Sequence, residues 1–503
     1  MFHLEMGTPE QFAALRESLT GAGFTEEALR RKLDIDPAKE LDLVGISTRP
    51  AVKRELAGML DAFIQLFVLG ESLAVADVAP LFPVAVWNAL NQMRLVLTGA
   101  EDASRCLGSV AIYPVRDLFI ASDRWTNIDH SLRPTFADIV YPALTKSVKQ
   151  FLEYTSFAPC EDFLEVCAGT APAALLAARS AKNSWATDIA ERSIDFAKFN
   201  AALNGIQNVT VLEGDLYQPL EGRAFDRIAA HPPYVPVIKR EEIYYGGGET
   251  GEEITRRIIA ELPARLKPGG RLYCRTLGTD RPGQGFEQRV RAWLGEKHSA
   301  FDVGLFVFQT LAPRLFALEE TIKKNEGREQ LAQREALFAK NEVKELVTGV
   351  VVVQRHAEQR PAFTIRRTMN NTPAASVEWA MDWEAEMHKD GAAQKLLQAK
   401  PVVAPGIGIT VRHVLRDGDI SPVDFTLSVE HPFTTDCKVQ PWMVLLLPLC
   451  DGKTSIAGLF EIAKQNGWIV PETPAEEFSR LLATMISGGF LQKETARLPA
   501  AAG

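Results

Sequence analysis

Three carboxylates follow short apolar runs in the middle of the chain, where they could hold a polar ligand. Glu165 and Asp188 lie near the ends of two runs, and Asp215 comes just after a third. Carboxylates accept hydrogen bonds from hydroxyl and amino groups. An acid about twenty residues after a small-residue turn commonly holds ribose hydroxyls. We therefore predict ribose binding for Asp188, while Asp215 could meet an adenine edge or simply form a turn.

A run of small residues separates the first apolar run from an alanine-rich stretch. Gly169-Thr170-Ala171 predicts a tight turn that leads into a helix. Small residues let a backbone approach a ligand closely, and a helix N-terminus favours polar or anionic groups. This turn is the second candidate part of a ligand site.

The third candidate part is the sequence His231-Pro232-Pro233-Tyr234. Each proline fixes its own φ and restricts the residue before it, so this turn should be rigid and extended. Tyr234 would then present an aromatic face to a planar substrate, with a core aromatic as the alternative. His231 could hydrogen-bond a substrate or take a proton with a pKa near neutral.

Alternating strands and helices should position these residues. Apolar runs near 162–168, 183–190, 209–212 and 225–231 alternate with helix-like stretches. This spacing predicts a parallel sheet with helices on both faces, an α/β fold. Ligands of such sheets lie at the carboxyl ends of the strands, where the candidate residues fall.

The order of these parts resembles the class I S-adenosylmethionine-dependent methyltransferases. Within them it is similar to the group with an (Asn/Asp)-Pro-Pro-Tyr motif, such as release-factor glutamine and rRNA N-methyltransferases. The similarity includes Tyr244-Tyr245-Gly246-Gly247-Gly248-Glu249-Thr250-Gly251 and covers roughly residues 140–356. It implies a seven-stranded Rossmann-like sheet, with its last two strands at an antiparallel edge, and S-adenosylmethionine as cofactor.

The resemblance also implies roles for individual residues. The cofactor-binding candidates are Glu165, Cys167, Gly169, Thr170, Asp188, Asp215 and Thr145. The catalytic candidates are His231, Pro232, Pro233 and Tyr234. Glu165 would hold the methionine amine, or else only order the glycine turn. Thr145 could touch the cofactor's carboxylate, but a helix cap is the favoured interpretation.

Two positions depart from the family pattern. The family has an acid followed by three alternate glycines, whereas this chain has Glu165-x-Cys167-x-Gly169-x-Ala171. A positive φ at Cys167 would be strained. His231 replaces the family's Asn or Asp, and a neutral imidazole accepts a hydrogen bond through only one nitrogen.

Length and composition indicate several domains. The chain has 503 residues, which is too long for one ordinary domain. We predict a helical, winged-helix-like domain over residues 1–135 and the methyltransferase domain over 136–370. A second winged-helix-like α+β module should cover 371–503. The charged stretch 315–344 is predicted to be an exposed helix, with a solvated face favoured over a binding arm.

Charge and cysteine usage bound the partners and the compartment. The net charge of −9 gives no support for broad electrostatic binding of nucleic acid. The 6 cysteines are scattered without metal-ligand spacing, and no apolar run approaches membrane-span length. These features favour a cytoplasmic protein with reduced thiols, no metal and no membrane contact.

The leading hypothesis is a methyltransferase acting on a planar nitrogen of a macromolecule, either RNA or a protein side chain. Flanking modules favour a large substrate. Two alternatives remain: methylation of a small molecule or modified peptide, and a non-catalytic scaffold that binds S-adenosylmethionine. The sequence leaves the oligomeric state open.

Overall fold

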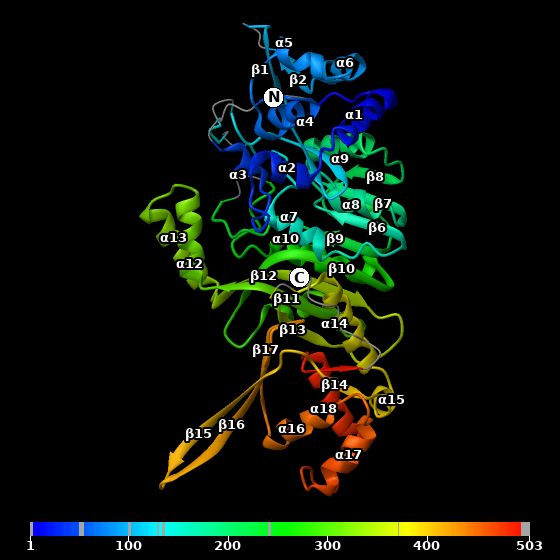
Figure 1. The fold of residues 1–503 in the computed structure, drawn as a ribbon, viewed down its shortest axis with the longest axis vertical. Helices are drawn as coiled ribbons and strands as arrows, with labels where there is room; N and C mark the ends of the chain where they lie inside the picture. The colour runs from blue at the N-terminus through cyan, green and yellow to red at the C-terminus, as the bar shows by residue number, and fades with distance from the viewer. Residues whose placement is uncertain are drawn as a thin grey trace. The chain divides into compact units, whose positions relative to one another are not determined.

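The computed structural model describes residues 4–49, 55–98, 102–127, 130–132, 136–239, 243–370 and 372–493. The chain divides into two compact units (Figure 1). The first comprises Met1–Gly278 and Ala317–Glu342, and the second comprises Thr279–Phe316 and Val343–Gly503.

Parallel strands form the centre of the first unit. Their spatial order is β8 (Val209–Glu213), β7 (Ala181–Asp188), β6 (Cys160–Val166), β9 (Phe225–Ala230) and β10 (Leu266–Asp280). Each neighbouring pair in this series is parallel. Their carboxyl ends therefore meet at one edge, as the sequence predicted.

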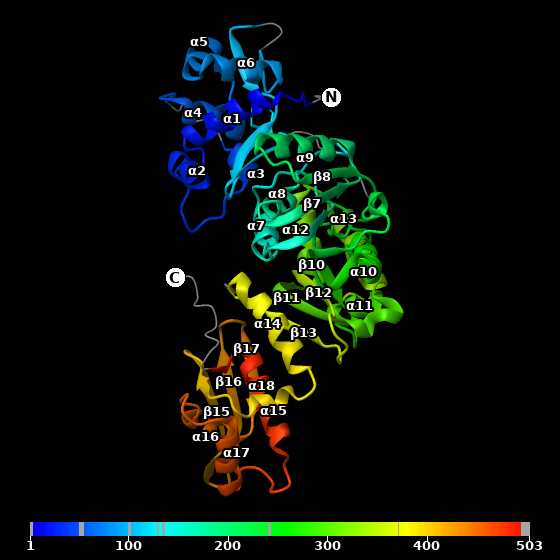
Figure 2. The ribbon, with the colours of Figure 1, turned by 90° about the vertical axis from the view of Figure 1, so that its right-hand side faces the viewer.

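One helix precedes these strands, and three others connect them. They are α7 (Lys146–Glu153), α8 (Pro172–Ala177), α9 (Glu191–Leu203) and α10 (Glu253–Arg265). Figure 2 shows α9 beside β8 and α8 beside β7, and both pairs are in contact. The predicted α/β architecture is therefore present.

The N-terminal part of the first unit is helical and then forms small antiparallel sheets. Its helices are α1 (Pro9–Gly21), α2 (Glu26–Leu33), α3 (Leu43–Ser47), α4 (Met59–Phe63), the π-helix η1 (Ile64–Leu69), α5 (Val75–Val78), the 3-10 turn η2 (Ala79–Leu81) and α6 (Val84–Gln92). A sheet of β1 (Leu73–Ala74), β3 (Arg105–Gly108) and β2 (Val96–Thr98) precedes the hairpin β4 (Ala111–Val115) and β5 (Leu118–Ser122). The winged-helix-like fold of residues 1–135 stays a prediction.

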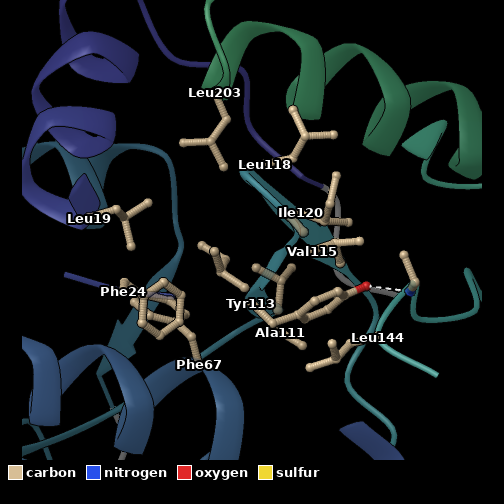
Figure 3. Packing of buried hydrophobic residues seen from close by; sticks show 14 of the residues in the cluster. Leu19, Phe24, Phe67, Ala111, Tyr113, Val115, Leu118, Ile120, Leu144 and Leu203 are labelled. Carbon is tan, nitrogen blue, oxygen red and sulfur yellow. Dashed lines mark hydrogen bonds between the residues drawn. The ribbon is translucent and has the colours of Figure 1, made fainter. Parts of the chain in front are cut away.

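One hydrophobic core joins this helical part to the sheet of the same unit. It includes side chains from α1, the β4–β5 hairpin and α9 (Figure 3). Tyr113 lies in this core, and its hydroxyl accepts a hydrogen bond from the backbone N–H of Ala143 at 2.8 Å. This bond satisfies a polar group that would be costly to bury alone.

The second unit contains the remaining strands of the large mixed sheet. β11 (Phe301–Leu311) pairs antiparallel with β12 (Glu345–Arg355), as the resemblance implied, and parallel with β13 (Thr364–Thr368). The described sheet thus has eight strands rather than seven. The extra strand β13 has one buried residue, Ile365, among polar neighbours, so its sequence contains no apolar run.

The rest of the second unit is a small α+β region with its own core. It contains α14 (Ala374–Met387), α15 (Ala392–Leu396), α16 (Pro441–Leu446), the 3-10 turn η5 (Leu447–Leu449), α17 (Ile456–Gln465) and α18 (Ala475–Ser487). β14 (Pro401–Val403) pairs with β18 (Leu491–Lys493). β15 (Gly408–Arg416), β16 (Asp419–Val429) and β17 (Thr435–Val439) form a separate antiparallel sheet.

Five further helical segments complete the description. α11 (Phe286–Trp293) and the 3-10 helix η4 (Gly295–Ala300) precede β11, and the 3-10 turn η3 (Gln218–Leu220) precedes β9. The predicted charged helix is a pair of helices, α12 (Pro313–Lys323) and α13 (Arg328–Lys340), with a break at Gly327.

Candidate active site

The turn after β6 keeps a glycine-like backbone although only one of its three alternate positions is glycine. The φ angles of Cys167, Gly169 and Ala171 are 56°, 53° and 58°. All three positions therefore adopt the left-handed conformation that glycine tolerates best. The strain predicted at Cys167 is present, and Ala171 shares it, at about 1–2 kcal/mol for each non-glycine residue.

Buried hydrogen bonds hold this turn in place. The Glu165 side chain, 2% exposed, accepts a bond from the Ala174 backbone N–H at 2.7 Å. Asn200 on α9 donates to the carbonyl of Thr170 at 3.2 Å. In this arrangement Glu165 orders the turn and the start of α8, which was one of its two predicted roles. Burial raises the pKa of the Glu165 carboxyl to about 8.

Asp188 links the turn to the helix that follows β7. One carboxylate oxygen accepts the Gly169 N–H at 2.8 Å, and the other accepts the Ala190 N–H at 3.0 Å. Burial raises the pKa of the Asp188 carboxyl. The Ser193 side chain and the Ile189 backbone also hydrogen-bond this carboxylate, so a ribose hydroxyl bound here would take the place of one of these contacts.

The other two cofactor candidates make different contacts. Asp215 forms an ion pair with Arg257 of α10, with 2.6 Å between Oδ2 and Nη2. Thr145 is the N-cap of α7, and its hydroxyl accepts a long bond from the Val148 N–H at 3.5 Å. The helix-cap interpretation of Thr145 therefore describes its geometry.

His231 follows β9 directly, and its ring packs against two aromatic rings. The centroid distance is 5.4 Å to Phe151 of α7 and 5.6 Å to Tyr234, which stacks at 24°. Burial, together with the nearby charge of Arg275, lowers the pKa of the His231 imidazole to about 3. The ring is neutral at physiological pH, so a proton-accepting role with a near-neutral pKa is wrong for this geometry.

Arg275 of β10 is a site residue that the sequence analysis missed. It is 6% exposed, and its guanidinium lies 5.4 Å from the centroid of the Tyr234 ring. It also donates to the Thr276 carbonyl at 2.8 Å and to the Gln150 side chain at 3.4 Å. A signal was available, because Arg275 is the one charged residue in the stretch from Leu272 to Leu277.

The glycine-rich segment packs against the His-Pro-Pro-Tyr turn through its backbone. Val235 N–H donates to the Tyr245 carbonyl at 3.1 Å, and the Gly247 N–H donates to the Val235 carbonyl at 2.9 Å. A Cβ at Gly251 would lie 2.1 Å from the Tyr234 carbonyl oxygen. The approach is therefore possible only with glycine there.

The helices α12 and α13 hold the same segment from outside. The Tyr245 hydroxyl donates to the carboxylate of Glu320. Lys340 pairs with Glu249 at 2.9 Å. The charged stretch was expected to present mainly a solvated face, but these contacts give it a second role in supporting the glycine-rich segment.

The residues at this edge fit S-adenosylmethionine in two respects. A Cβ built on Gly169 would have no atom within 4 Å, so the turn leaves open space beside it. Asp188 ends β7, where a ribose would lie, and a ribose hydroxyl could take the place of the Ser193 side chain at its carboxylate. Among the described residues, no cluster of His, Cys, Asp and Glu could hold a metal ion.

Comparisons with known proteins agree with this geometry. Residues 151–278 match the family described as the Methyltransferase small domain. The chain is 31% identical over 157 residues to a ribosomal protein uL3 glutamine methyltransferase from Bradyrhizobium diazoefficiens, covering 28% of this chain and 49% of that protein. It is 32% identical over 145 residues to a release factor glutamine methyltransferase from Deinococcus radiodurans, covering 26% of this chain and 51% of that protein.

These matches confirm the resemblance to class I S-adenosylmethionine-dependent methyltransferases and, within them, to the glutamine methyltransferases. The chain spans about half the length of these curated relatives. No helix in the described residues is both long and apolar enough to cross a bilayer.

Proposed function

We propose that the protein transfers a methyl group from S-adenosylmethionine to the side-chain nitrogen of a glutamine in a protein substrate. The observation that carries this proposal is the rigid His231–Tyr234 turn at the end of β9, close in sequence to a glycine-rich segment that packs on it. The relatives are named as glutamine methyltransferases, which favours a carboxamide over a nucleobase.

Some residues at the sheet edge would bind the cofactor, and others would bind the acceptor. Asp188 would bind the ribose, and the turn from Glu165 to Ala171 would approach the rest of the cofactor. Asp215, Thr145, Cys167 and Thr170 remain proposed cofactor contacts. S-Adenosylmethionine supplies an electrophilic methyl group on a sulfonium, so orientation of the acceptor should provide much of the catalysis.

On the acceptor side, the neutral His231 ring would accept a hydrogen bond from the substrate N–H. Tyr234 would stack on the planar carboxamide, and Pro232 and Pro233 would fix both residues. The His231 pKa of about 3 supports a neutral hydrogen-bond acceptor and not a general base. Transfer would leave S-adenosylhomocysteine, and the proton lost from the methylated nitrogen would pass to solvent, because an imidazole with a pKa of about 3 would not keep it.

The test is transfer of radiolabelled methyl from S-adenosylmethionine into host extract, followed by RNase or protease treatment in parallel. We expect protease-sensitive label that is recovered as N-methylglutamine after enzymatic digestion of the labelled protein. RNase-sensitive label would indicate that the substrate is RNA and not a protein. Label confined to small molecules, or cofactor binding without any label, would overturn the proposal.

The remaining organisation is part of the same proposal. Domains at 1–135, 136–370 and 371–503, with winged-helix-like modules at both ends, would give a large substrate two places to dock. A protein substrate and a cytoplasmic location are consistent with the translation-related names of the relatives.

A further inference from the structure

The β15–β16 ribbon of the second unit has one apolar face and one polar face. Its register places four pairs on one side: Ile409 with Leu427, Val411 with Phe425, His413 with Pro422, and Leu415 with Ile420. The opposite side carries Thr410 with Thr426, Arg412 with Asp424, Val414 with Ser421, and Arg416 with Asp419. A register shift between Arg412 and His413 leaves Val423 of β16 without a paired residue on β15. A one-sided apolar pattern is typical of a sheet whose apolar face is covered by another layer.

The apolar face begins in the core of the unit and ends in solvent. Leu427 is fully buried in that core, whereas Ile409 is 47%, Leu415 69% and Ile420 72% exposed. Figure 1 shows the ribbon extending away from α16, α17 and α18 of the same unit. The core surface thus continues outward along an arm that the described residues leave uncovered.

The outer part of the arm consists of two strands alone. Within the described residues, β17 pairs with β16 only from Phe425 to Val429. At the tip, Asp417 and Gly418 have φ angles of 52° and 88°, which match a two-residue hairpin turn with the natural twist of the strands. An isolated two-stranded ribbon is only marginally stable in water, so its apolar face favours a partner layer.

We propose that this face pairs with the same face of a second copy of the chain, related by a two-fold axis. In an antiparallel face-to-face arrangement, the exposed Leu415 and Ile420 of one arm would cover Ile409 and Val411 of the other. Each copy supplies the same patch, which is the rule for two-fold interfaces. The two layers would lie about 10 Å apart, as in other stacked sheets.

Charge and chemistry favour a second copy as the occupant. The arm from Gly408 to Val429 carries two arginines and three aspartates. It is therefore almost neutral, and two copies would not repel each other. Both arginines lie on the polar face, away from the apolar one, so the apolar face offers no cations for the headgroups of an anionic membrane.

The test compares two double variants of the full chain by sedimentation velocity over a range of concentrations. Leu415→Glu with Ile420→Glu places charges on the apolar face. Val414→Glu with Ser421→Glu places the same charges one register step away, on the polar face. We expect wild-type protein and the polar-face variant to form dimers of twice the 55.4 kDa chain mass, and the apolar-face variant to dissociate at least 10-fold more readily.

Three results would overturn the proposal. They are a monomeric wild type at the highest concentration, equal weakening by both variants, and a dimer that neither variant affects. Because all four positions are on a solvent-exposed arm, circular dichroism should show the same fold in each protein. Loss of dimers does not depend on any enzymatic activity, so this result is separate from that of the methylation assay.

Discussion

The turn after β6 and the segment beside the His-Pro-Pro-Tyr turn both contain left-handed backbone, but they tolerate side chains differently. Cys167 and Ala171 adopt positive φ angles without being glycine. Gly248 and Gly251 also have positive φ, at 90° and 80°, and a Cβ at either would clash with neighbouring atoms. The turn after β6 requires only a left-handed backbone. The glycine-rich segment requires a left-handed backbone and also space that a Cβ would fill.

The difference shows which glycine positions of the family pattern can accept another residue. Strain at a positive φ costs about 1–2 kcal/mol, which the bonds from Glu165, Asp188 and Asn200 can offset locally. A clash of 2.1 Å with a backbone carbonyl cannot be relieved without moving the chain. Substitutions on the cofactor side should therefore be mild, and those on the acceptor side severe.

The largest effect is expected for Gly251→Ala. The new Cβ would displace Tyr234, and misplacement by about 1 Å can cost roughly 100-fold in turnover. Affinity for S-adenosylmethionine, measured by calorimetry, should change less than about threefold if the shift stays on the acceptor side. The matched control is Gly222→Ala, which has a φ of 72° but no atom within 4 Å of its Cβ. Equal loss of methyl transfer in both would contradict the role of close packing.

His231→Ala should reduce turnover by roughly 5- to 100-fold, because it leaves the substrate N–H without its acceptor at a cost of about 1–3 kcal/mol. Cofactor affinity should stay nearly intact, because His231 is placed on the acceptor side. His231→Asn restores an acceptor oxygen and should recover part of the rate. With an imidazole pKa of about 3, His231 should add no inflection to the wild-type rate between pH 6 and 8. A collapse of cofactor affinity would move His231 to the other side of the site.

Asp188→Ala should weaken cofactor binding by roughly tenfold, because it removes the ribose acceptor and two backbone bonds. Asp215→Ala should weaken it less than about threefold, since that carboxylate is exposed and already paired with Arg257. Calorimetric titration of each variant with S-adenosylmethionine measures the loss of cofactor affinity and shows which carboxylate contributes more. The reverse order would assign the principal cofactor carboxylate to Asp215.

Glu165 should make stability depend on pH. Its carboxyl has a pKa of about 8 in the folded protein against 4.5 as the ordinary value. The folded state therefore binds the proton more tightly, so this contribution to stability is full below about pH 4.5 and is lost as the pH rises through about 8. Glu165→Gln should remove a slope of up to about 1.4 kcal/mol per pH unit within this window. Urea unfolding at pH 5.5, 6.5 and 7.5 measures it, and parallel slopes would exclude Glu165 as the cause.

The sequence predicted the strands and the edge where the candidate residues lie, because buried parallel strands appear as short apolar runs between helical patterns. It did not predict β13, whose single buried Ile365 gives no run. It also gave no hairpin for β15 and β16, although Asp417-Gly418 is a recognisable hairpin signal. The winged-helix-like modules remain predictions.

Side-chain contacts were less predictable than positions. Most partners of Glu165 and Asp188 are backbone amides, which every residue except proline carries, so no residue type marks them in the sequence. The low pKa of His231 depends on burial and on Arg275, a residue 44 positions later in the chain. Such contacts between distant segments are fixed by the fold and are not encoded in a local pattern.

The smallest effect is expected for Cys167→Gly. Glycine relieves about 1–2 kcal/mol of left-handed strain, but it gains entropy in the unfolded chain that costs about 0.5–1 kcal/mol. The free energy of unfolding should therefore change by no more than about 1 kcal/mol, with a slight gain. Cofactor affinity should not fall, because the backbone already has the shape that glycine prefers. A large loss of affinity would mean that the Cys167 side chain itself contacts the cofactor, and that the cofactor-side turn depends on its side chains after all.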